Sequence, residues 1–225
     1  MLPRHHLNND TMDTVKLSMG IVATLSALVL GLLIASAKSS NDAARNEVTA
    51  IIAKIVFTDR LLAIYGPDAA PARSTLRLAV VDMKERLWPE NPFMSVRLDP
   101  KRVSTFNTYR AIEQLSPRNE QQKELKARIQ QNVYELGQLN WLVFEQATPS
   151  ISRLMLAILI SWLAILFISF GLFAPLNGTA VGALILAALS VAGAIFLLLE
   201  LDEPFGGLIR ISSQSIVNTL NYLGK

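Results

Sequence analysis

The feature that most constrains this chain is an apolar run from Leu154 to Leu199 that contains no Asp, Glu, Lys, Arg or His. As one helix it would be about 69 Å long, roughly twice the ~30 Å hydrocarbon thickness of a bilayer. The run must therefore fold back on itself, and Pro175 with Asn177-Gly178 is typical of a turn. The sequence predicts two membrane-spanning helices, at 154–173 and 179–199, joined by a very short connection.

A third apolar segment, from Leu17 to Ala37, has 21 residues without a charge and predicts a further span at 17–37. The alternative is a cleaved signal peptide, because Ala35-Ser36-Ala37 has the small-x-small form of a cleavage site. A signal core holds only ~7–15 apolar residues and follows a basic leader, whereas here two aspartates offset Arg4 and Lys16. These differences favour an uncleaved first span.

Charged residues are confined to the N-terminal tail (1–16), the segment between the first two spans (38–153) and the C-terminal exit turn and tail (200–225). This distribution is typical of a membrane protein with one sizeable aqueous segment rather than of a soluble domain. We therefore predict an all-α membrane protein with one N-terminal span, a C-terminal helical hairpin and an inserted helical cytoplasmic domain.

Helical spacing runs through the whole of 38–153, where apolar residues recur every three or four positions. Gly66-Pro67 predicts the end of one helix, and Trp88-Pro89 predicts the end of the next, which begins near Pro71. Residues 89–104 contain three prolines and read as a loop. A short helix around Tyr109 follows, and Ser116-Pro117 predicts the start of a long helix that ends near Gln146.

Basic residues close to the spans predict the orientation. One side is flanked by Lys38, Arg45, Lys54, Arg153 and Arg210, and the other only by Arg4 and Lys16. This predicts an inner-membrane protein with its N-terminus outside and with the helical domain and C-terminus in the cytoplasm. A long translocated segment can escape the rule, so an extracytoplasmic domain is the alternative. The formal net charge of +3 suits the anionic lipid bilayer better than nucleic acid.

The residue types exclude much site chemistry. The chain has no cysteine, and its two histidines are His5 and His6 in the N-terminal tail. Catalytic triads, thiolate nucleophiles and His-ligated metal sites therefore lack their residues. No glycine-rich phosphate-binding loop is present either. We expect no enzymatic activity, no metal and no cofactor.

Small residues recur in two of the predicted spans at spacings that let helix backbones approach closely in lipid. They are Ala23, Ala27, Gly31 and Ala35 in the first span, and Ala180, Ala183, Ala187, Ser190 and Ala194 in the third. Packing within one subunit and packing between the subunits of a homo-oligomer are both compatible with this pattern. The middle span carries bulky residues such as Trp162 and Phe170, and we expect it to face lipid or to fill space.

The chain leaves the last span through an acidic, glycine-containing run. Its candidate functional residues are Glu200, Asp202, Glu203, Pro204, Phe205, Gly206, Gly207 and Arg210. Carboxylates at a helix C-terminus interact unfavourably with the negative end of the helix dipole unless a nearby cation compensates their charge. A simple helix end at the water interface is one interpretation, and a turn docked through Arg210 or another cation is the other. Pro204 predicts the end of the helix, and we expect a positive φ at Gly206.

This run, from Glu200 to Ser212, resembles the end-of-span signature of a bacterial membrane family described as bestrophin-like. The resemblance extends to Tyr65-Gly66-Pro67-Asp68-Ala69 with Arg73, to Trp88-Pro89-Glu90, and to Pro149 followed by Trp162. It implies a helical membrane protein with a cytoplasmic helical domain, and its relation to true bestrophins implies an oligomeric anion channel.

The chain departs from true bestrophins in two respects. In those proteins an Asn-Pro-Phe-Gly stretch followed by acidic residues contributes to calcium sensing. Here Glu203-Pro204-Phe205-Gly206 aligns with that stretch, but Gly207-Leu208 stand where the acidic residues should follow, which argues against calcium sensing. Three predicted spans replace the expected four. The sequence is therefore compatible with an anion channel, and equally with a non-conducting scaffold or sensor whose helical domain binds a cytoplasmic partner.

Overall fold

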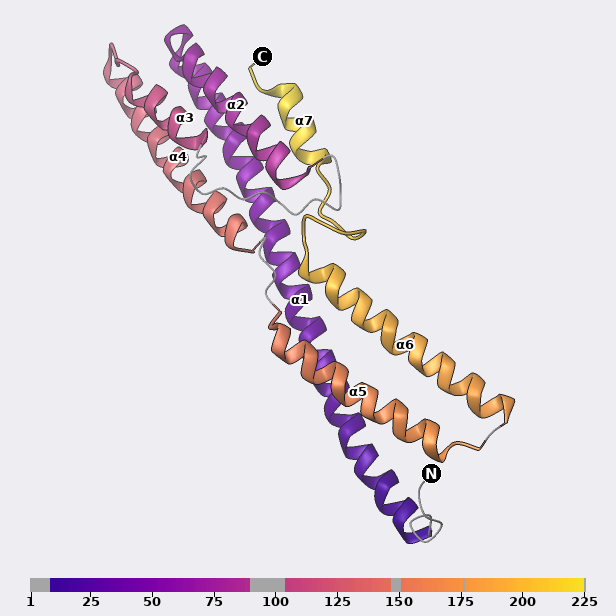
Figure 1. Ribbon diagram of the computed structural model, residues 1–225. Helices are drawn as coiled ribbons and strands as arrows, with labels where there is room; N and C mark the ends of the chain where they lie inside the picture. Colours follow the sequence, from indigo (N-terminus) through magenta and orange to yellow (C-terminus); the bar gives the residue numbers. More distant parts are fainter. Residues whose placement is uncertain (1–8, 90–103, 147–150, 176, 225) are drawn as a thin grey trace. The chain divides into compact units, whose positions relative to one another are not determined.

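The structure is a computed structural model that describes residues 9–89, 104–146, 151–175 and 177–224 (Figure 1). These residues form helices and no strand, so the predicted all-helical class is confirmed. The elements are α1 (Asn9–Tyr65), the 3-10 helix η2 (Pro67–Ala69), α2 (Ala70–Leu87), α3 (Ser104–Glu113), α4 (Glu120–Gln146), α5 (Arg153–Phe173), α6 (Gly178–Asp202) and α7 (Gln214–Tyr222).

The chain divides into two compact units. We call residues 1–39 with 150–202 the apolar unit, and residues 40–149 with 203–225 the globular unit. Helix α1 contributes to both. The division falls within the acidic exit run, so Glu200 and Asp202 belong to the apolar unit and the residues from Glu203 onward belong to the globular unit.

Three helices are long and apolar enough to cross a membrane, namely α1, α5 and α6. The three predicted apolar helices are therefore present. The first predicted span is not a separate helix, because it forms the N-terminal part of a single α-helix of 57 residues. No Gly or Pro occurs between Ala37 and Tyr65, so nothing in the backbone stops the helix after the apolar segment.

The connection between α5 and α6 follows the turn chemistry expected from Pro175 and Asn177. The Asn177 backbone N–H donates to the Pro175 carbonyl at 2.8 Å, which closes a tight turn. The Asn177 side-chain oxygen accepts from the Ala180 N–H at 2.8 Å and so caps the start of α6.

The apolar unit has a small core. Its core cluster of buried apolar residues consists of Leu33, Ala37, Leu159 and Leu198. In the most apolar 18-residue stretch of each helix, 11% of the residues are buried in α1, 11% in α5 and 6% in α6. Most residues of these apolar stretches are therefore not buried within the described part of the chain.

The globular unit has a much larger core, drawn from every one of its helices. Members from α1 and α2 include Ile51, Ile55 and Leu76, and α4 adds Ile129 and Val133. Residues that follow the last span complete the same core, namely Phe205, Ile211, Ile216 and Leu223. The segment after α6 is thus packed into this unit, and α7 lies beside α2 (Figure 1).

The helix boundaries agree with the sequence at α2 and differ at α4. Helix α2 ends at Leu87 with Trp88 as its C-cap, as predicted. The predicted start of the long helix at Ser116-Pro117 is wrong, because α4 begins at Glu120. Asn119 accepts from the Gln122 N–H at 2.8 Å and supplies the N-cap instead. Most of the predicted loop at 89–104 lies outside the described residues.

Candidate functional site

A buried aromatic contact and a buried hydrogen bond lie where the chain after α6 meets the end of α2. Phe205 is 2% exposed, and its ring meets the Trp88 ring edge-on at 5.5 Å and 84°. The Trp88 indole N–H donates to the Ile211 carbonyl at 2.6 Å. Two motifs that are far apart in the sequence, around Trp88-Pro89 and around Pro204-Phe205, therefore form one structural junction.

Between its two buried ends the exit run forms a closed loop. The Ile211 N–H donates to the Pro204 carbonyl at 2.8 Å, and the Gly206 N–H donates to the Glu203 carbonyl at 3.2 Å. Pro204 is buried and Glu203 is exposed. An aromatic pair and backbone hydrogen bonds hold the run after Glu203, and docking of the exit turn through a cation stays a prediction.

The expected backbone conformation at Gly206 is wrong. Gly207 carries the positive φ, at 64°, and Gly206 does not. The constraint at Gly206 is steric, because an added Cβ would lie 3.0 Å from the Glu203 carboxylate Oε2. The turn needs glycine at position 207 for its positive φ. At position 206 glycine leaves room for the neighbouring Glu203 carboxylate.

Arg210 does not dock the exit run. Its side chain is exposed, and no ion pair of Arg210 occurs among the residues that the structure describes. Phe205 and Ile211 hold the run instead, because their burial in the core needs no charge partner. A charge-based prediction from the sequence missed this, and the apolar residues on either side of the glycines were the available signal.

The acidic end of α6 belongs to the apolar unit, where a backbone N–H donates to the Asp202 carboxylate. Asp202 is 8% exposed, and its two carboxylate oxygens accept from the Ile151 N–H at 3.2 and 3.4 Å. Ile151 directly precedes Ser152, the N-cap of α5. Since α5 and α6 are an antiparallel hairpin, the negative end of α6 meets the positive end of α5. Glu200, half-buried in the last turn of α6, lies in the same unit.

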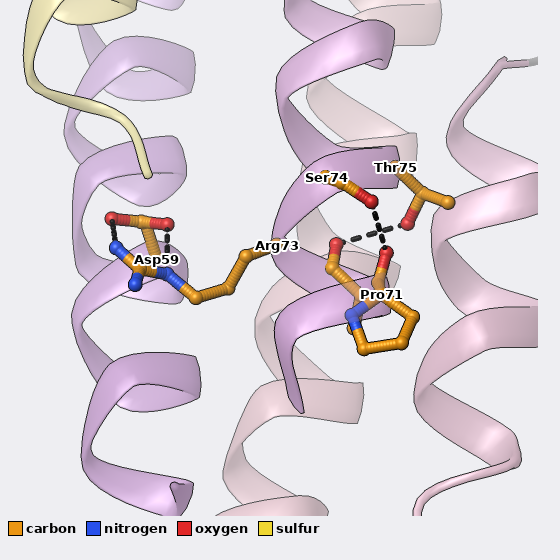
Figure 2. A network of polar contacts seen from close by, with 6 residues as sticks. Asp59, Pro71, Arg73, Ser74 and Thr75 are labelled. Carbon is orange, nitrogen blue, oxygen red and sulfur yellow. Dashed lines mark hydrogen bonds and ion pairs between the residues drawn. The ribbon is translucent and has the colours of Figure 1, made fainter. Parts of the chain in front are cut away.

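A second set of polar contacts joins α1 to the start of α2 (Figure 2). Arg73 donates from Nε to Asp59 Oδ1 at 2.8 Å and from Nη2 to Asp59 Oδ2 at 2.9 Å. Asp59 is 6% exposed, and hydrogen bonding to it raises the pKa of Arg73. Beside the pair, Ser74 donates to the Pro71 carbonyl at 2.9 Å. This fork-to-carboxylate geometry fixes the direction in which α2 leaves α1.

The Tyr65-Gly66-Pro67-Asp68-Ala69 motif forms the corner before α2. Gly66 has a φ of 117°, and the Tyr65 carbonyl accepts from Gln122 Nε2 at 3.0 Å. Asp68 pairs with Arg118 at 2.8 Å. Tyr65 is buried, and this burial, followed by the charge of Asp68, raises the pKa of its phenol. The motif thus ties α1 to the start of α4, and its contacts indicate a structural role.

The small-residue stripes are exposed in the single chain. Ala27, Gly31 and Ala35 in α1 are exposed while Ala23 is half-buried, and in α6 Ala183, Ala187 and Ser190 are exposed while Ala180 and Ala194 are half-buried. A Cβ added at Gly31 would meet nothing within 4 Å. Close packing of these stripes against other helices of the same chain is therefore not seen in the described residues.

Among the described residues no group of three or more His, Cys, Asp or Glu side chains could hold a metal ion. His5 and His6 lie outside the described residues. The buried carboxylates Asp59 and Asp202 already accept hydrogen bonds from Arg73 and Ile151, respectively. In the described part of the chain these carboxylates therefore serve helix docking.

Comparisons with known proteins agree with these motifs. A family model described as the Bestrophin-like domain matches residues 1–216. A single-substitution variant of a bacterial bestrophin homologue from Klebsiella pneumoniae has a TM-score of 0.72 and 17% identity, covering 91% of this chain and 84% of that chain. Another structure of a bestrophin homologue from the same organism has a TM-score of 0.71 and 18% identity, covering 90% and 83%. At these identities the likeness establishes the fold. No curated protein sequence matches the chain.

Proposed function

This chain belongs to the bestrophin-like domain family, and we propose on that basis that it is a subunit of a homo-oligomeric anion channel in the cell membrane. The observation that carries the proposal is the exposure of the small-residue stripes on α1 and α6 in the single chain. In lipid, small residues at these spacings bring helix backbones into close contact. Because no helix of the described chain covers them, neighbouring copies are the partners that we propose.

The two C-terminal spans carry no charge, which is compatible with an uncharged channel wall although transport pathways commonly contain ionisable residues. From Leu154 to Leu199 the chain has no ionisable side chain. Uncharged, apolar constrictions are one of the known ways in which channels gate an ion path. We assign the chain no enzymatic activity and no cofactor, and both assignments stay predictions.

We further propose that the protein lies in the inner membrane with the globular unit on the cytoplasmic side and the N-terminus outside. Lys38, Arg45 and Arg153 support this orientation, because basic residues close to span ends favour the cytoplasm. Topology reporters placed after Lys225 and inserted after Asn91 should both report a cytoplasmic location. A periplasmic signal from either position would reject this orientation.

The assembly step is tested by adding bulk to the α1 stripe. Ala27→Leu with Gly31→Leu should reduce the mass of the detergent-extracted complex toward that of one subunit, because each leucine separates backbones that would otherwise touch. Ala157→Leu with Gly171→Leu adds the same bulk to exposed positions of α5 and should leave the mass unchanged. An unchanged mass for the α1 variant would show that its stripe faces lipid.

The transport step is tested in reconstituted vesicles. Wild-type protein of confirmed fold and oligomer mass should give anion flux, and the α1 stripe variant should lose it along with assembly. Absence of flux from folded, oligomeric wild-type protein over a range of pH and calcium concentration would reject the channel. The non-conducting alternative, a membrane scaffold or sensor whose globular unit binds a cytoplasmic partner, would then replace it.

A further inference from the structure

The loop between Phe205 and Ile211 presents its most apolar side chains to solvent. Leu208 is 79% exposed and Ile209 is 47% exposed, whereas Phe205 and Ile211 at the two ends of the loop are 2% and 5% exposed. Isolated exposed apolar residues are normal on protein surfaces. Leu208 and Ile209 are adjacent, and burial of Phe205 and Ile211 at the loop ends holds this apolar pair outside the core.

The position of this loop along the chain identifies what can cover it. Helix α6 has 25 residues from Gly178 to Asp202, which at ~1.5 Å per residue gives about 37 Å. The hydrocarbon core of a bilayer is ~30 Å thick, and the headgroup layers extend it to ~40–45 Å. The charge-free part of α6 ends at Leu199. Its last turn therefore reaches the headgroup layer, and the chain begins the loop there.

The closure of the loop keeps its tip close to that layer. Leu208 is six residues beyond Asp202, a separation that extends to at most about 20 Å. The hydrogen bond from the Ile211 N–H to the Pro204 carbonyl shortens this reach further, because it brings the two ends of the loop together. Arg210 follows the apolar pair and is exposed. Apolar side chains beside a basic one are the combination that binds the boundary between acyl chains and anionic headgroups.

We propose that Leu208 and Ile209 insert into the headgroup–acyl boundary of the leaflet in which α6 ends, with Arg210 against anionic lipid headgroups. The loop is then a membrane anchor of the globular unit, and the Trp88–Phe205 junction holds it in position. The inference requires α6 to cross the bilayer, and it does not depend on ion conduction or on the number of subunits.

The absence of cysteine in the chain permits a direct test. A nitroxide spin label is attached to Leu208→Cys, and separately to Ile209→Cys, in full-length protein reconstituted into vesicles that contain phosphatidylglycerol. Molecular oxygen partitions into the acyl region, and a water-soluble nickel chelate stays outside it. The ratio of oxygen to nickel accessibility should be severalfold higher at both loop positions than at a control position. Leu78→Cys in α2 is that control, because Leu78 is 66% exposed and lies in the same unit.

A second reference position separates failure of the anchor from failure of the span. Leu186→Cys lies within α6 and replaces a residue that is 67% exposed in the single chain, so it should show high oxygen accessibility. Suppose that position 186 is accessible to oxygen while position 208 is as accessible to nickel as position 78. That result would overturn the anchor and would leave the membrane span of α6 intact. Low accessibility to both reagents at Leu208 would also overturn it, because a neighbouring subunit then covers the loop. Nickel accessibility at Leu186 would overturn the anchor together with the span.

Discussion

The globular unit and the apolar unit both bury leucines completely, but they do so against different solvents. Leu76 in α2 is 1% exposed and Leu198 in α6 is 0% exposed. When the globular unit unfolds, Leu76 enters water, whereas separation of the apolar helices leaves Leu198 in lipid. Burial of a leucine therefore stabilises the globular unit through the hydrophobic effect. In the apolar unit it stabilises chiefly through van der Waals packing. In lipid, exposed apolar side chains carry little penalty, which is compatible with the few buried residues of the apolar unit.

The largest expected effect tests this difference directly. Leu76→Ala should lower the free energy of unfolding of the globular unit by about 4 kcal/mol, because the lost transfer term and the new cavity add. Leu198→Ala removes the same atoms, and we expect a loss of only about 1 kcal/mol, since lipid replaces water as the reference. Denaturation of each variant in the same detergent, followed by circular dichroism, measures both. Equal losses would contradict the comparison.

The next effect concerns the buried ion pair between Asp59 and Arg73 in the globular unit. Asp59→Asn should cost the globular unit about 3 kcal/mol, because Arg73 would keep its charge in a largely buried position without a carboxylate. The control is Asp68→Asn, whose partner Arg118 has a side chain that is 75% exposed. It should cost about 0.5 kcal/mol or less. A loss at Asp59 no greater than at Asp68 would show that water reaches the Asp59–Arg73 pair.

A smaller effect is expected at the exit loop, which follows the apolar unit in the chain but packs into the globular unit. Gly207→Ala should destabilise the globular unit by about 1 kcal/mol, because alanine is strained at a positive φ. Gly206→Ala should cost less, since the carboxylate it would meet is the end of the flexible Glu203 side chain. Denaturation curves compare the two variants. A greater loss at Gly206 would show that space, rather than φ, limits the loop.

The smallest effect is a pH dependence confined to the globular unit. Hydrogen bonding from Lys54, and then from Gln131, lowers the pKa of Glu135 below its usual value of 4.5. A carboxyl whose pKa falls on folding stabilises the folded state above its unfolded pKa, and this contribution is lost as the pH falls through the folded pKa. Stability should therefore decline below about pH 4.5, and Glu135→Gln should make the decline shallower. Identical pH profiles for the two proteins would reject this ion pair in solution.

Local chemistry accounts for most features that were predictable from the sequence. The charge-free runs predicted three apolar helices, and Pro175 with Asn177 predicted the tight connection between α5 and α6. Trp88 ends α2 as expected. The predicted start of α4 was wrong because Ser116 and Asn119 both provide capping chemistry, and the local sequence does not select between them.

The candidate site was predictable as a location and not as a set of contacts. The exit run from Glu200 to Arg210 stood out for its carboxylates and glycines, yet its docking depends on Phe205, Trp88 and Ile211. The two parts of this junction are more than a hundred residues apart in the sequence. No local spacing relates such positions, and an aromatic residue beside glycines has no single preferred partner.

The sequence by itself determined what each segment is suited to. Runs without charge must avoid water, helical spacing creates one apolar face, and prolines and turn residues end helices, because these effects act within a few residues. Only the tertiary structure decided which groups meet. It placed Asp202 at the N-terminus of α5, Arg73 on Asp59 and Phe205 against Trp88. Such pairings depend on how whole helices pack, because packing determines which neighbour each side chain contacts.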